Sequence, residues 1–580
     1  NNSGMDGARS ATAVVVALAT TMTGMARAEM ADTSRAGLTP PLQRVAVGSD
    51  GGLGAAAGDG EPVVVIGGGL AGLTAALEAR RAAGVRVVLV DAAEKLGGNS
   101  AKASSGMNWL ADDGGDSEEL FTGDTLRSGG GLSDEALVGK LVAESLAARD
   151  FLRAHGVVLG KRSQCGAHSV ARTHRNEPPG PNVGNVLIRA LADAVHADAG
   201  IEVRTSTRAR ALLTAREGEP CPDRAMPEGE APDDVRVCGV TLSIAGAPGA
   251  DEQLVELRAR AVVLATGGFA ASAAHVQRWA PALAALPTTN GETASGEGIE
   301  LAVRAGAALV DMPHVQVHPT ALVNRSAPDQ RTLWLAPEAL RAAGGVLVAY
   351  SSGTRFVDEL GTRAAVTAAI RALPGARAAL VLGEAAARSF GVSALRFYAT
   401  QGFAYELSVG AGAGAAQAAR ALAEHIGVDA DALERSLADY DALAARAAAG
   451  EANVRDAFGK KVFPAPVLAH SPTPPGGQAA EPPAGTLFVL EVTPALHYCM
   501  GGVRIGERAQ VLSAASGEPI GGLYAAGEVT GGVHGANRLA GNSLLECVVF
   551  GRTAGKAAAL EPVRVDAGIG GMGSAGGAGS

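Results

Sequence analysis

The chain contains 580 residues, of which 47% are hydrophobic, so it can form two or three domains or one large domain with an insertion. Its net charge is −10 and it carries no basic stripe, which argues against nucleic acid as a partner. The five cysteines show no haem, zinc or iron–sulfur spacing, so no metal site is expected, and free thiols are favoured over a disulfide such as Cys221 with Cys238. No apolar run reaches the roughly 20 residues that span a bilayer, so no transmembrane segment is expected.

The first 60 residues are expected to be a targeting leader followed by a linker. Arg9 precedes a short apolar core, and Ala26-Arg27-Ala28 has the pattern of a signal-peptide cleavage site. The same stretch carries Ser, Thr and Arg without acidic residues, which fits a transit peptide almost as well, and a disordered leader is a third alternative. These readings leave the compartment open between mitochondrion, secretory pathway and periplasm.

Residues 62–91 are predicted to form a strand, a glycine turn, a helix and a second strand. Gly67, Gly69 and Gly72 form a GxGxxG pattern directly after an apolar run, and Asp91 closes the second strand. In this context the glycines let the backbone approach a pyrophosphate at a helix N-terminus, and the acid accepts hydrogen bonds from a ribose. The segment therefore predicts a dinucleotide site.

The dinucleotide is expected to be FAD rather than NAD. A second glycine-rich segment, "KLGGNSAKASSGMN", follows soon after Asp91 and suits a long ligand. Two later strands, "AVVLATGGF" at 261–269 and "GGLYAAGEVTGG" at 521–532, also end in glycine turns, and the second contains Glu528. Because only one nucleotide fingerprint is present, scattered segments that return to one nucleotide favour FAD.

A glycine-rich loop near the end of the chain, "GGVHGANRLAGNSLLE" at 531–546, places His534 and Arg538 beside the start of a helix. Glycine permits close backbone approach, and a helix N-terminus offers N–H donors to a negative or electron-rich ligand. We therefore expect a ligand at this loop. The polar stretches 216–234 and 470–485 are expected to be surface loops, and 563–580 a disordered tail.

A series of ordered motifs covers residues 62–560 and includes "IGGGLAGLTAALEA", "GAHSVARTHR", "HPTALV", "PEALRAAGGVLV", "RFVDELGTR", "HYCMGGVRI" and "GEVTGGVHGANRLAGNS". It resembles the soluble fumarate reductase and flavocytochrome c branch of the succinate dehydrogenase/fumarate reductase flavoproteins, most closely the single-chain eukaryotic forms. The resemblance implies an α/β fold in which a Rossmann-like FAD-binding domain is interrupted by an α+β mobile capping domain, with the active site between them. The implied segments are a leader and linker at 1–60, the FAD-binding domain at 61–312 and 497–562, the cap at 313–496, and a tail at 563–580.

The resemblance also implies non-covalent FAD. Membrane-complex relatives attach flavin through a histidine after the first Gly-Gly, and here that segment has Asn99 near the position and no histidine. Backbone N–H groups of Gly541 and of residues 542–544 are implied to face the flavin pyrimidine edge, where a helix N-terminus stabilises negative charge. The expected FAD contacts are Gly67, Gly69, Gly72, Asp91, Gly98, Asn99, Ser100, Ser105, Gly106, Ala265, Thr266, Gly267, Glu528, Ser543 and Leu544.

By the same resemblance, a C4-dicarboxylate site is formed by His318, Arg363, His497 and Arg538. Arginine and histidine donors can hold both carboxylates, and Arg538 is implied to contact one of them. Flavin N5 is implied to deliver a hydride to one alkene carbon, and Arg363 a proton to the other. For each residue taken alone, a structural role is the alternative.

Glu338 and Arg341 are implied to relay protons from solvent to Arg363, and their alternative is a solvated i, i+3 ion pair. Three positions depart from the family pattern. Pro337 stands where bacterial relatives often carry Ser or Thr, Tyr498 where they often carry a second His, and Glu297 where Asp is usual. These changes concern fine tuning of the relay and of the flavin potential.

The expected reaction is the reduction of fumarate to succinate. Urocanate and aspartate are alternative substrates because one carboxylate site would be shared, whereas a ketosteroid enzyme would rely on tyrosines, of which this chain has six. A flavin-binding carrier without turnover is another class of function, and the presence of Arg363 and His318 argues against it. The expected electron donor is reduced flavin, a partner reductase, or NADH through a mediator.

Overall fold

The structure is a computed structural model that describes residues 60–111, 114–177, 182–216, 219–222, 235–244, 252–328, 330–410, 412–469 and 484–562. The predicted leader, most of the two predicted surface loops and the predicted tail lie outside these residues.

The first sheet is built on parallel strands that are buried on both faces. The strand order is β6-β2-β1-β10-β20-β8-β7, and the runs VVVI, VVLV and AVVL are fully buried, as expected for a parallel sheet covered by helices. The helix α1 (Leu70–Ala83) packs against α5 (Val183–Ala197) and α14 (Asn542–Ala559). The central strands are β1 (Val63–Ile66), β2 (Val87–Val90), β6 (Ile201–Arg204), β10 (Ala261–Leu264) and β20 (Pro519–Ala525).

This topology determines where the site lies. Because β1, β2, β10 and β20 run parallel, their carboxyl ends meet at one edge of the sheet. Segments that follow these strands are far apart in the sequence: the glycine turn at 67–69, Asp91, the turn at 265–267 and the segment 526–528. They are therefore brought together, and this confirms that the scattered glycine-rich segments return to one place.

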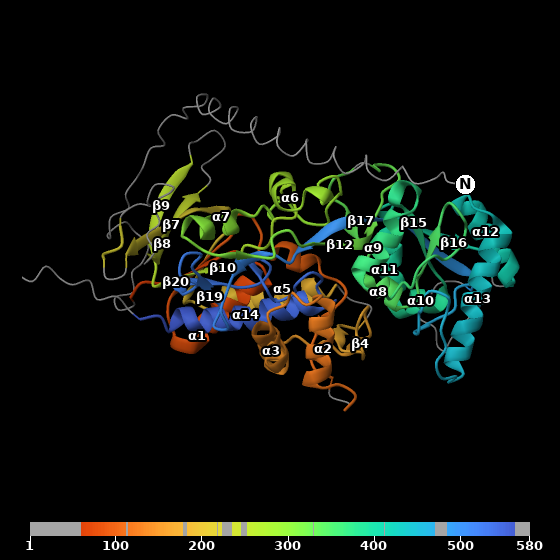
Figure 1. The fold of residues 1–580 in the computed structure, drawn as a ribbon, viewed down its shortest axis with the longest axis horizontal. Helices are drawn as coiled ribbons and strands as arrows, with labels where there is room; N and C mark the ends of the chain where they lie inside the picture. Colours follow the sequence, from red (N-terminus) through yellow and green to blue (C-terminus); the bar gives the residue numbers. More distant parts are fainter. Residues whose placement is uncertain are drawn as a thin grey trace, which may run out of the picture.

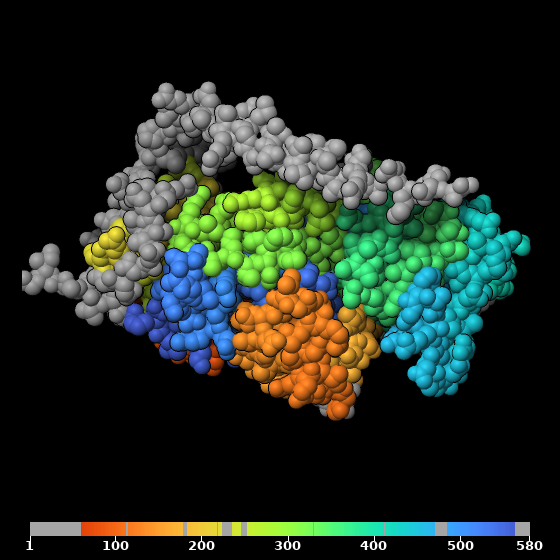
Figure 2. Space-filling model, viewed as in Figure 1, coloured from red at the N-terminus to blue at the C-terminus, as the bar shows by residue number. Residues whose placement is uncertain are grey.

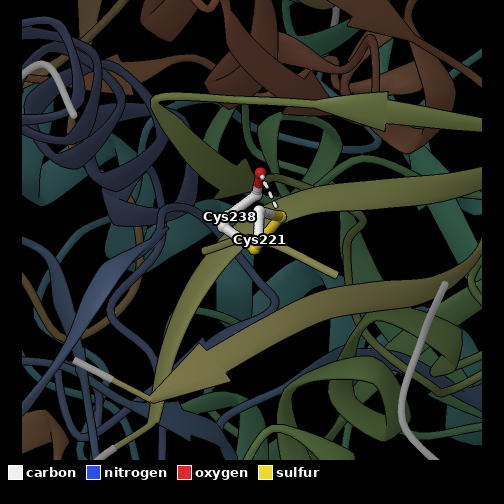
Figure 3. Close-up of a disulfide and its surroundings, with 2 residues drawn as sticks. All are labelled: Cys221 and Cys238. Carbon is white, nitrogen blue, oxygen red and sulfur yellow. Dashed lines mark hydrogen bonds between the residues drawn. A yellow bond between two sulfur atoms is a disulfide. The ribbon is translucent and has the colours of Figure 1, made fainter. Parts of the chain in front are cut away.

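An antiparallel extension continues the first sheet and contains a disulfide. Strands β7 (Thr207–Arg216), β8 (Val235–Ile244) and β9 (Gln253–Arg258) pair side by side, and Cys238 on β8 is bonded to Cys221 (Figure 3). The expectation of free thiols is wrong for this pair. Sequence spacing did not show that Cys221 lies against Leu213, Ala215 and Cys238, with which it forms one small apolar cluster.

The second sheet is antiparallel and has its own core. Its strands are ordered β13-β12-β17-β15-β14 with β16 on β17, and they are surrounded by α8 to α13 at one end of the molecule (green to cyan in Figures 1 and 2). The strands are β12 (Val315–Leu322), β13 (Trp334–Leu335), β14 (Val346–Ala349), β15 (Ala378–Leu382), β16 (Ala404–Ser408) and β17 (Thr486–Cys499). The helices are α8 (Glu338–Ala342), α9 (Arg363–Arg371), α10 (Glu384–Phe390), α11 (Val392–Thr400), α12 (Ala415–Ile426) and α13 (Ala430–Ala448).

Two strands, β12 and β17, connect the cores. Val315 and Leu496 are buried in the core of the first sheet, whereas Leu322 and Val492, further along the same two strands, belong to a core of the second. The strands are paired across this boundary, with His318 opposite Ala495. Side chains on this stretch therefore lie where the two parts of the chain meet.

The remaining elements surround the first sheet (Figure 1). Within the described residues, no helix is both long and apolar enough to cross a bilayer. These elements are β3 (Met107–Asn108), α2 (Glu118–Ser128), α3 (Glu135–Ala143), α4 (Ser145–Ala154), β4 (Lys161–Ser163), β5 (Thr173–Arg175), α6 (Ala273–Trp279), α7 (Glu297–Arg304), β11 (Leu309–Val310), β18 (Gly502–Arg504), β19 (Gln510–Leu512) and β21 (Thr530–Gly531), with short 3₁₀ turns at Gly98–Lys102, Pro281–Leu283 and Pro374–Ala376.

Candidate active site

A cavity of about 1030 Å³ opens at the carboxyl edge of the first sheet and extends to the second. Its lining comes from many separate segments and includes nearly all of the residues that the sequence predicts for FAD. These lining residues are Gly67, Gly69, Asp91, Gly98, Asn99, Ser100, Ser105, Gly106, Ala265, Thr266, Gly267, Glu528, Ser543 and Leu544.

The glycine turn after β1 explains the GxGxxG spacing. Gly67 has φ +109°, and a Cβ on it would lie 2.3 Å from the Ala265 carbonyl oxygen, so only glycine fits this crossing of two chain segments. Gly69 is the N-cap residue of α1 and lines the cavity at the N-terminus of that helix, where the Leu70 N–H donates to Ser100 Oγ at 3.3 Å. Gly72 is not among the lining residues. Its Cβ would lie 1.8 Å from the Gly67 carbonyl oxygen, so it permits close packing of helix and turn.

Asp91 stands at the cavity with its carboxylate oriented by the backbone. Its Oδ2 accepts from Gly68 N–H at 2.6 Å and its Oδ1 from Ala93 N–H at 2.7 Å. Burial raises the pKa of this carboxyl, and these two N–H donors oppose that shift. Each oxygen retains a second lone pair, so the geometry is compatible with hydrogen bonds from a ribose.

The segment with Asn99 borders the same cavity. Asn99 Nδ2 donates to Asn290 Oδ1 at 2.7 Å, and Gly291 N–H donates back to Asn99 Oδ1 at 2.9 Å. The side chain is therefore tied to the chain on both of its polar atoms. An amide is not a nucleophile for flavin attachment, which is consistent with the predicted non-covalent cofactor.

Glu528 lines the cavity and is half-buried there. Burial raises the pKa of its carboxyl to about 7, although the Cys499 N–H, which donates to Glu528 Oε1 at 2.9 Å, acts in the opposite direction. The neighbouring carboxylate of Glu546 contributes to the upward shift. A carboxyl that is easily kept neutral can donate a hydrogen bond to a hydroxyl as well as accept one.

The two halves of the glycine-rich loop at 531–546 lie in different surroundings. The half with Arg538, Gly541, Ser543 and Leu544 lines the cavity, and α14 begins there at residue 542. Gly541 has φ +84°, and a Cβ on it would lie 2.2 Å from Asn108 Oδ1.

His534, in the other half of this loop, is buried away from the cavity. Its Nε2 lies 2.9 Å from Glu546 Oε2, and the Tyr498 hydroxyl donates to the same carboxylate oxygen. The Arg538 guanidinium lies over the Tyr498 ring, 4.8 Å from its centroid. Tyr498, one of the departures noted in the sequence, is therefore used to support Arg538 from behind.

The predicted substrate residues converge. Arg363, His497 and Arg538 line the cavity, and His318 stacks edge-on against His497 with ring centroids 5.1 Å apart. Arg363 is the first residue of α9, and the two histidines lie on β12 and β17, where the cores meet. The structure therefore places the two histidines side by side.

Glu338 and Arg341 lie behind Arg363 and are not solvated. Glu338 Oε2 accepts from Arg363 Nε at 3.0 Å and lies 3.8 Å from Arg341 Nη2. Because Glu338 is 1% exposed and Arg341 0%, the alternative of a solvated surface pair is wrong. The fully buried Arg341 is also not the point at which a relay meets solvent.

Gln316 is a functional residue that the sequence reasoning missed. Its Oε1 accepts from Arg363 Nη1 at 2.7 Å, while its Nε2 donates to the Arg538 carbonyl oxygen at 2.9 Å and to Asn537 Oδ1 at 3.1 Å. It therefore links the two arginines of the site. The available signal was a buried amide on an otherwise largely apolar strand, two residues before His318.

The titratable side chains of the site differ in charge. Burial, reinforced by Arg363, lowers the pKa of His318 and His497 well below the usual range, so both imidazoles are neutral. Burial alone would raise the pKa of Glu338, but Arg363, Arg341 and the Gly166 N–H lower it to about 2. Burial and the charge of Arg363 lower the pKa of Arg538 to about 9. At neutral pH the cavity wall therefore combines cationic arginines with neutral histidines.

Two buried nitrogen atoms of the substrate set have no protein partner in the described part of the chain, and one of them belongs to His318, which is fully buried beside His497 and does not itself line the cavity. Among the described residues, Arg538 Nε and His318 Nε2 are buried and bonded to no other protein atom. Buried polar atoms are normally paired, so these atoms are suited to a polar ligand. With arginine charge beside them, a carboxylate is the ligand chemistry that fits best. No group of three or more metal-binding side chains occurs in the part of the chain that the structure describes.

The comparisons with known proteins agree with this geometry. The family described as FAD binding domain matches residues 62–544. Fumarate reductase 1 of Saccharomyces cerevisiae is 34% identical over 514 residues, which cover 86% of this chain and 98% of that protein. L-Aspartate oxidase of Caulobacter vibrioides is 34% identical over 515 residues, which cover 86% of this chain and 76% of that one. The solved open conformation of a flavocytochrome c3 fumarate reductase is similar with a TM-score of 0.61 and 30% identity, over 86% of this chain and 78% of that one.

Proposed function

Because the chain belongs to the FAD binding domain family, as the sequence resemblance predicts, we propose that it is an oxidoreductase that uses FAD to reduce fumarate to succinate. The observation that carries the proposal is the convergence of Arg363 and Arg538 on the cavity that also contains the expected FAD residues. Two fixed cations in one enclosed site suit a dianion with a carboxylate at each end.

Substrate binding is assigned to Arg538, His318 and His497. Arg538 is held in place by the Tyr498 ring, by its own Nη1 bond to the Leu539 carbonyl oxygen at 3.1 Å, and by its burial, while its Nε stays free. Both histidines are neutral and offer N–H groups to a carboxylate without adding charge. Donors aimed at one carboxylate polarise the alkene and lower the barrier to hydride addition.

Bound FAD would supply the hydride, and Arg363 is assigned the matching proton. Arg363 Nε is bound to Glu338 and its Nη1 to Gln316, so Nη2 is the remaining group that can face an alkene carbon. Arginine gives up a proton reluctantly. Glu338 lies next to it as a carboxylate and Arg341 lies beyond, so these two residues are assigned the path by which a proton that enters from outside this row would pass through Arg341 and Glu338 to Arg363.

Residues 313–496 are proposed to form a cap that closes over the site. The support is that the second sheet has separate core clusters and joins the first part through β12 and β17. Arg363 comes from the cap side and Arg538 from the FAD side. Closure would therefore assemble the two arginines and exclude water from the reaction.

The electron donor is proposed to be reduced flavin, a partner reductase, or NADH through a mediator. For the compartment we propose an oxidising one, such as the secretory pathway or periplasm, with the mitochondrion as the alternative. The support is the Cys221–Cys238 disulfide, because reducing compartments seldom maintain such bonds.

The experiment is anaerobic reoxidation of the reduced protein-bound flavin by candidate acceptors. Fumarate should restore the oxidised flavin spectrum rapidly, and the product should be succinate. Urocanate and iminoaspartate serve as the competing acceptors, because a related enzyme acting on either would share one carboxylate contact. Faster reoxidation by one of them than by fumarate would overturn the substrate assignment, and no reaction with any acceptor would favour a flavin-binding protein without turnover.

A further inference from the structure

The loop between β4 and β5 touches both halves of the proposed site. On one side, the Gly166 N–H donates to Glu338 Oε1 at 2.7 Å. On the other side, His168 Nε2 lies 2.9 Å from the Ala540 carbonyl oxygen, two residues after Arg538. One short loop of the first part of the chain therefore contacts the carboxylate behind Arg363 and the backbone that presents Arg538.

Gly166 is tightly enclosed by the proposed cap. A Cβ at this position would lie 2.9 Å from the Gly361 carbonyl oxygen, 3.0 Å from that of Leu360 and 3.1 Å from Glu338 Oε1. Leu360 and Gly361 lie just before Thr362, the N-cap residue of the helix that begins with Arg363. The proposed cap therefore contacts Gly166 beside two of its own side chains, Glu338 and Arg363.

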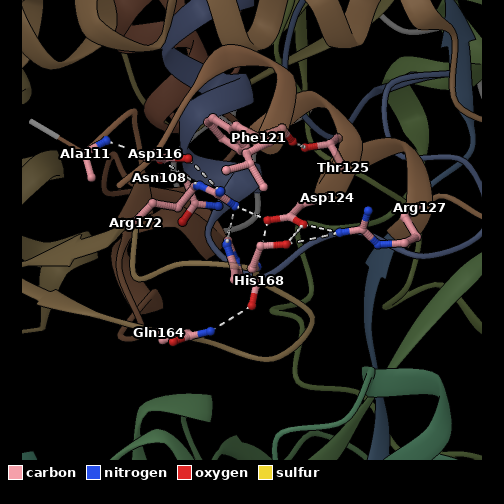
Figure 4. Close-up of polar contacts among 12 residues, drawn as sticks. Asn108, Ala111, Asp116, Phe121, Asp124, Thr125, Arg127, Gln164, His168 and Arg172 are labelled. Atoms are coloured by element: carbon pink, nitrogen blue, oxygen red, sulfur yellow. Dashed lines mark hydrogen bonds and ion pairs between the residues drawn. The ribbon is translucent and has the colours of Figure 1, made fainter. Parts of the chain in front are cut away.

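His168 is held in one protonation state by a buried charge cluster (Figure 4). Arg172 Nη1 lies 3.2 Å from His168 Nδ1, and because arginine can only donate, Nδ1 must accept. The ring proton then lies on Nε2, which donates to Ala540. Burial, with Arg172 adding to it, lowers the pKa of His168 to about 4, so the ring stays neutral.

The cluster is held together by several charge-assisted hydrogen bonds. Arg172 donates to Asp116 through Nε at 2.9 Å and Nη2 at 2.7 Å, and its Nη1 also donates to Asp124. All three side chains are fully buried. Asp124 additionally accepts from the N–H of Ser169, next to His168, at 2.8 Å. Loop and cluster therefore form one connected unit.

We propose that residues 165–168 are the seat on which the closed cap docks, and that Gly166 and His168 are positioning residues for the reaction. Gly166 fixes Glu338 and, through it, the Arg363 that donates the proton. His168 fixes the backbone that holds Arg538 against the substrate carboxylate. The inference rests on the proposed function for the roles of the two arginines, but its two contacts make separable predictions about proton delivery and about substrate binding.

The test compares four variants of the full-length FAD-bound protein. Gly166→Ala adds the Cβ that meets the cap. His168→Asn is too short to reach Ala540, and His168→Gln can restore an N–H donor. Gly160→Ala is the matched control, because Gly160 is an exposed glycine just before β4 whose Cβ would meet only Glu177 Oε1 at 3.8 Å. The first readout is the kinetics of fumarate reduction. The second is the affinity for malonate, a dicarboxylate without an alkene that reports binding alone, measured from the oxidised flavin spectrum.

Gly166→Ala should lower kcat about tenfold or more while malonate affinity stays within about twofold, because a misplaced acid affects the transition state alone. His168→Asn should weaken malonate binding about tenfold, the effect of one lost buried hydrogen bond, and His168→Gln should recover most of it. Flavin content should match that of Gly160→Ala throughout.

Three results would overturn the inference. Gly166→Ala and His168→Asn could both behave like Gly160→Ala, His168→Gln could bind malonate as weakly as His168→Asn, or Gly166→Ala and both His168 variants could lose flavin together. An unmodified protein that binds malonate but does not reduce fumarate would instead reject the proposed function. In that case the malonate affinities of His168→Asn and His168→Gln still decide the role of His168.

Discussion

At the scale of single residues, the buried carboxylate of Glu338 controls the charge of the site. Its pKa falls from an ordinary value of 4.5 to about 2 because the neighbouring arginines outweigh the effect of burial. A carboxyl whose pKa is lower in the folded than in the unfolded protein stabilises the fold above pH 4.5, and this contribution is lost as pH falls from 4.5 to about 2. The size of the shift corresponds to on the order of 3 kcal/mol.

We therefore predict that Glu338→Gln lowers the free energy of unfolding at pH 7 and that the difference from wild type shrinks as the pH approaches 3. Denaturant unfolding at several pH values measures both quantities. The exposed Glu424 on α12 offers Glu424→Gln as the matched control, for which no such trend is expected. A difference that is independent of pH would contradict the pairing of Glu338 with the arginines.

Arg538 should act through binding geometry rather than charge alone. Arg538→Lys keeps the positive charge but loses the planar fork and its contact with the Tyr498 ring. We expect KM for fumarate to rise about 10- to 100-fold, the effect of losing a charge-assisted contact, with a smaller fall in kcat. Steady-state kinetics measure this, with Arg504→Lys on the exposed side of β18 as control. An unchanged KM would remove Arg538 from the carboxylate site.

At the scale of elements, the disulfide links Cys221 to Cys238 on β8. The two cysteines are 17 residues apart, so by loop-closure entropy the bond should contribute about 3 kcal/mol to stability. Alkylation of the denatured protein without reductant should label three cysteines, Cys165, Cys499 and Cys547, and prior reduction should add Cys221 and Cys238. Mass spectrometry that finds all five labelled without reductant would contradict the disulfide.

At the scale of the whole molecule, FAD would occupy the junction of many segments and hold them together. Asn99 offers no nucleophile for a covalent link, so acid or heat should release all of the flavin as free FAD. Precipitation followed by absorbance and chromatography of the supernatant tests this directly. Flavin that stays with the precipitated polypeptide would reject the non-covalent assignment.

The sequence predicted the parts of the site that depend on local pattern. The Gly67 turn, Asp91 and the glycine turns after later strands lie around one cavity, as local motifs predicted. The four polar residues of the substrate set were assigned by the family resemblance, because their spacing alone could not show that they meet. The sequence could not predict Gln316, His168 or the Cys221–Cys238 bond. Each of these depends on contacts between distant segments, such as His168 with Ala540, and a lone buried amide, histidine or cysteine carries no local signature of its partner.

Arg363 is assigned the proton that completes fumarate reduction. The most direct measurement is the rate at which fumarate reoxidises the reduced flavin in Arg363→Ala, beside Arg371→Ala at the exposed end of the same helix. We predict that kcat and kcat/KM fall together by about 10²–10⁴-fold in Arg363→Ala, with flavin content unchanged, and that Arg371→Ala behaves as wild type. A near-normal rate in Arg363→Ala would contradict the account and transfer the acid role to another group.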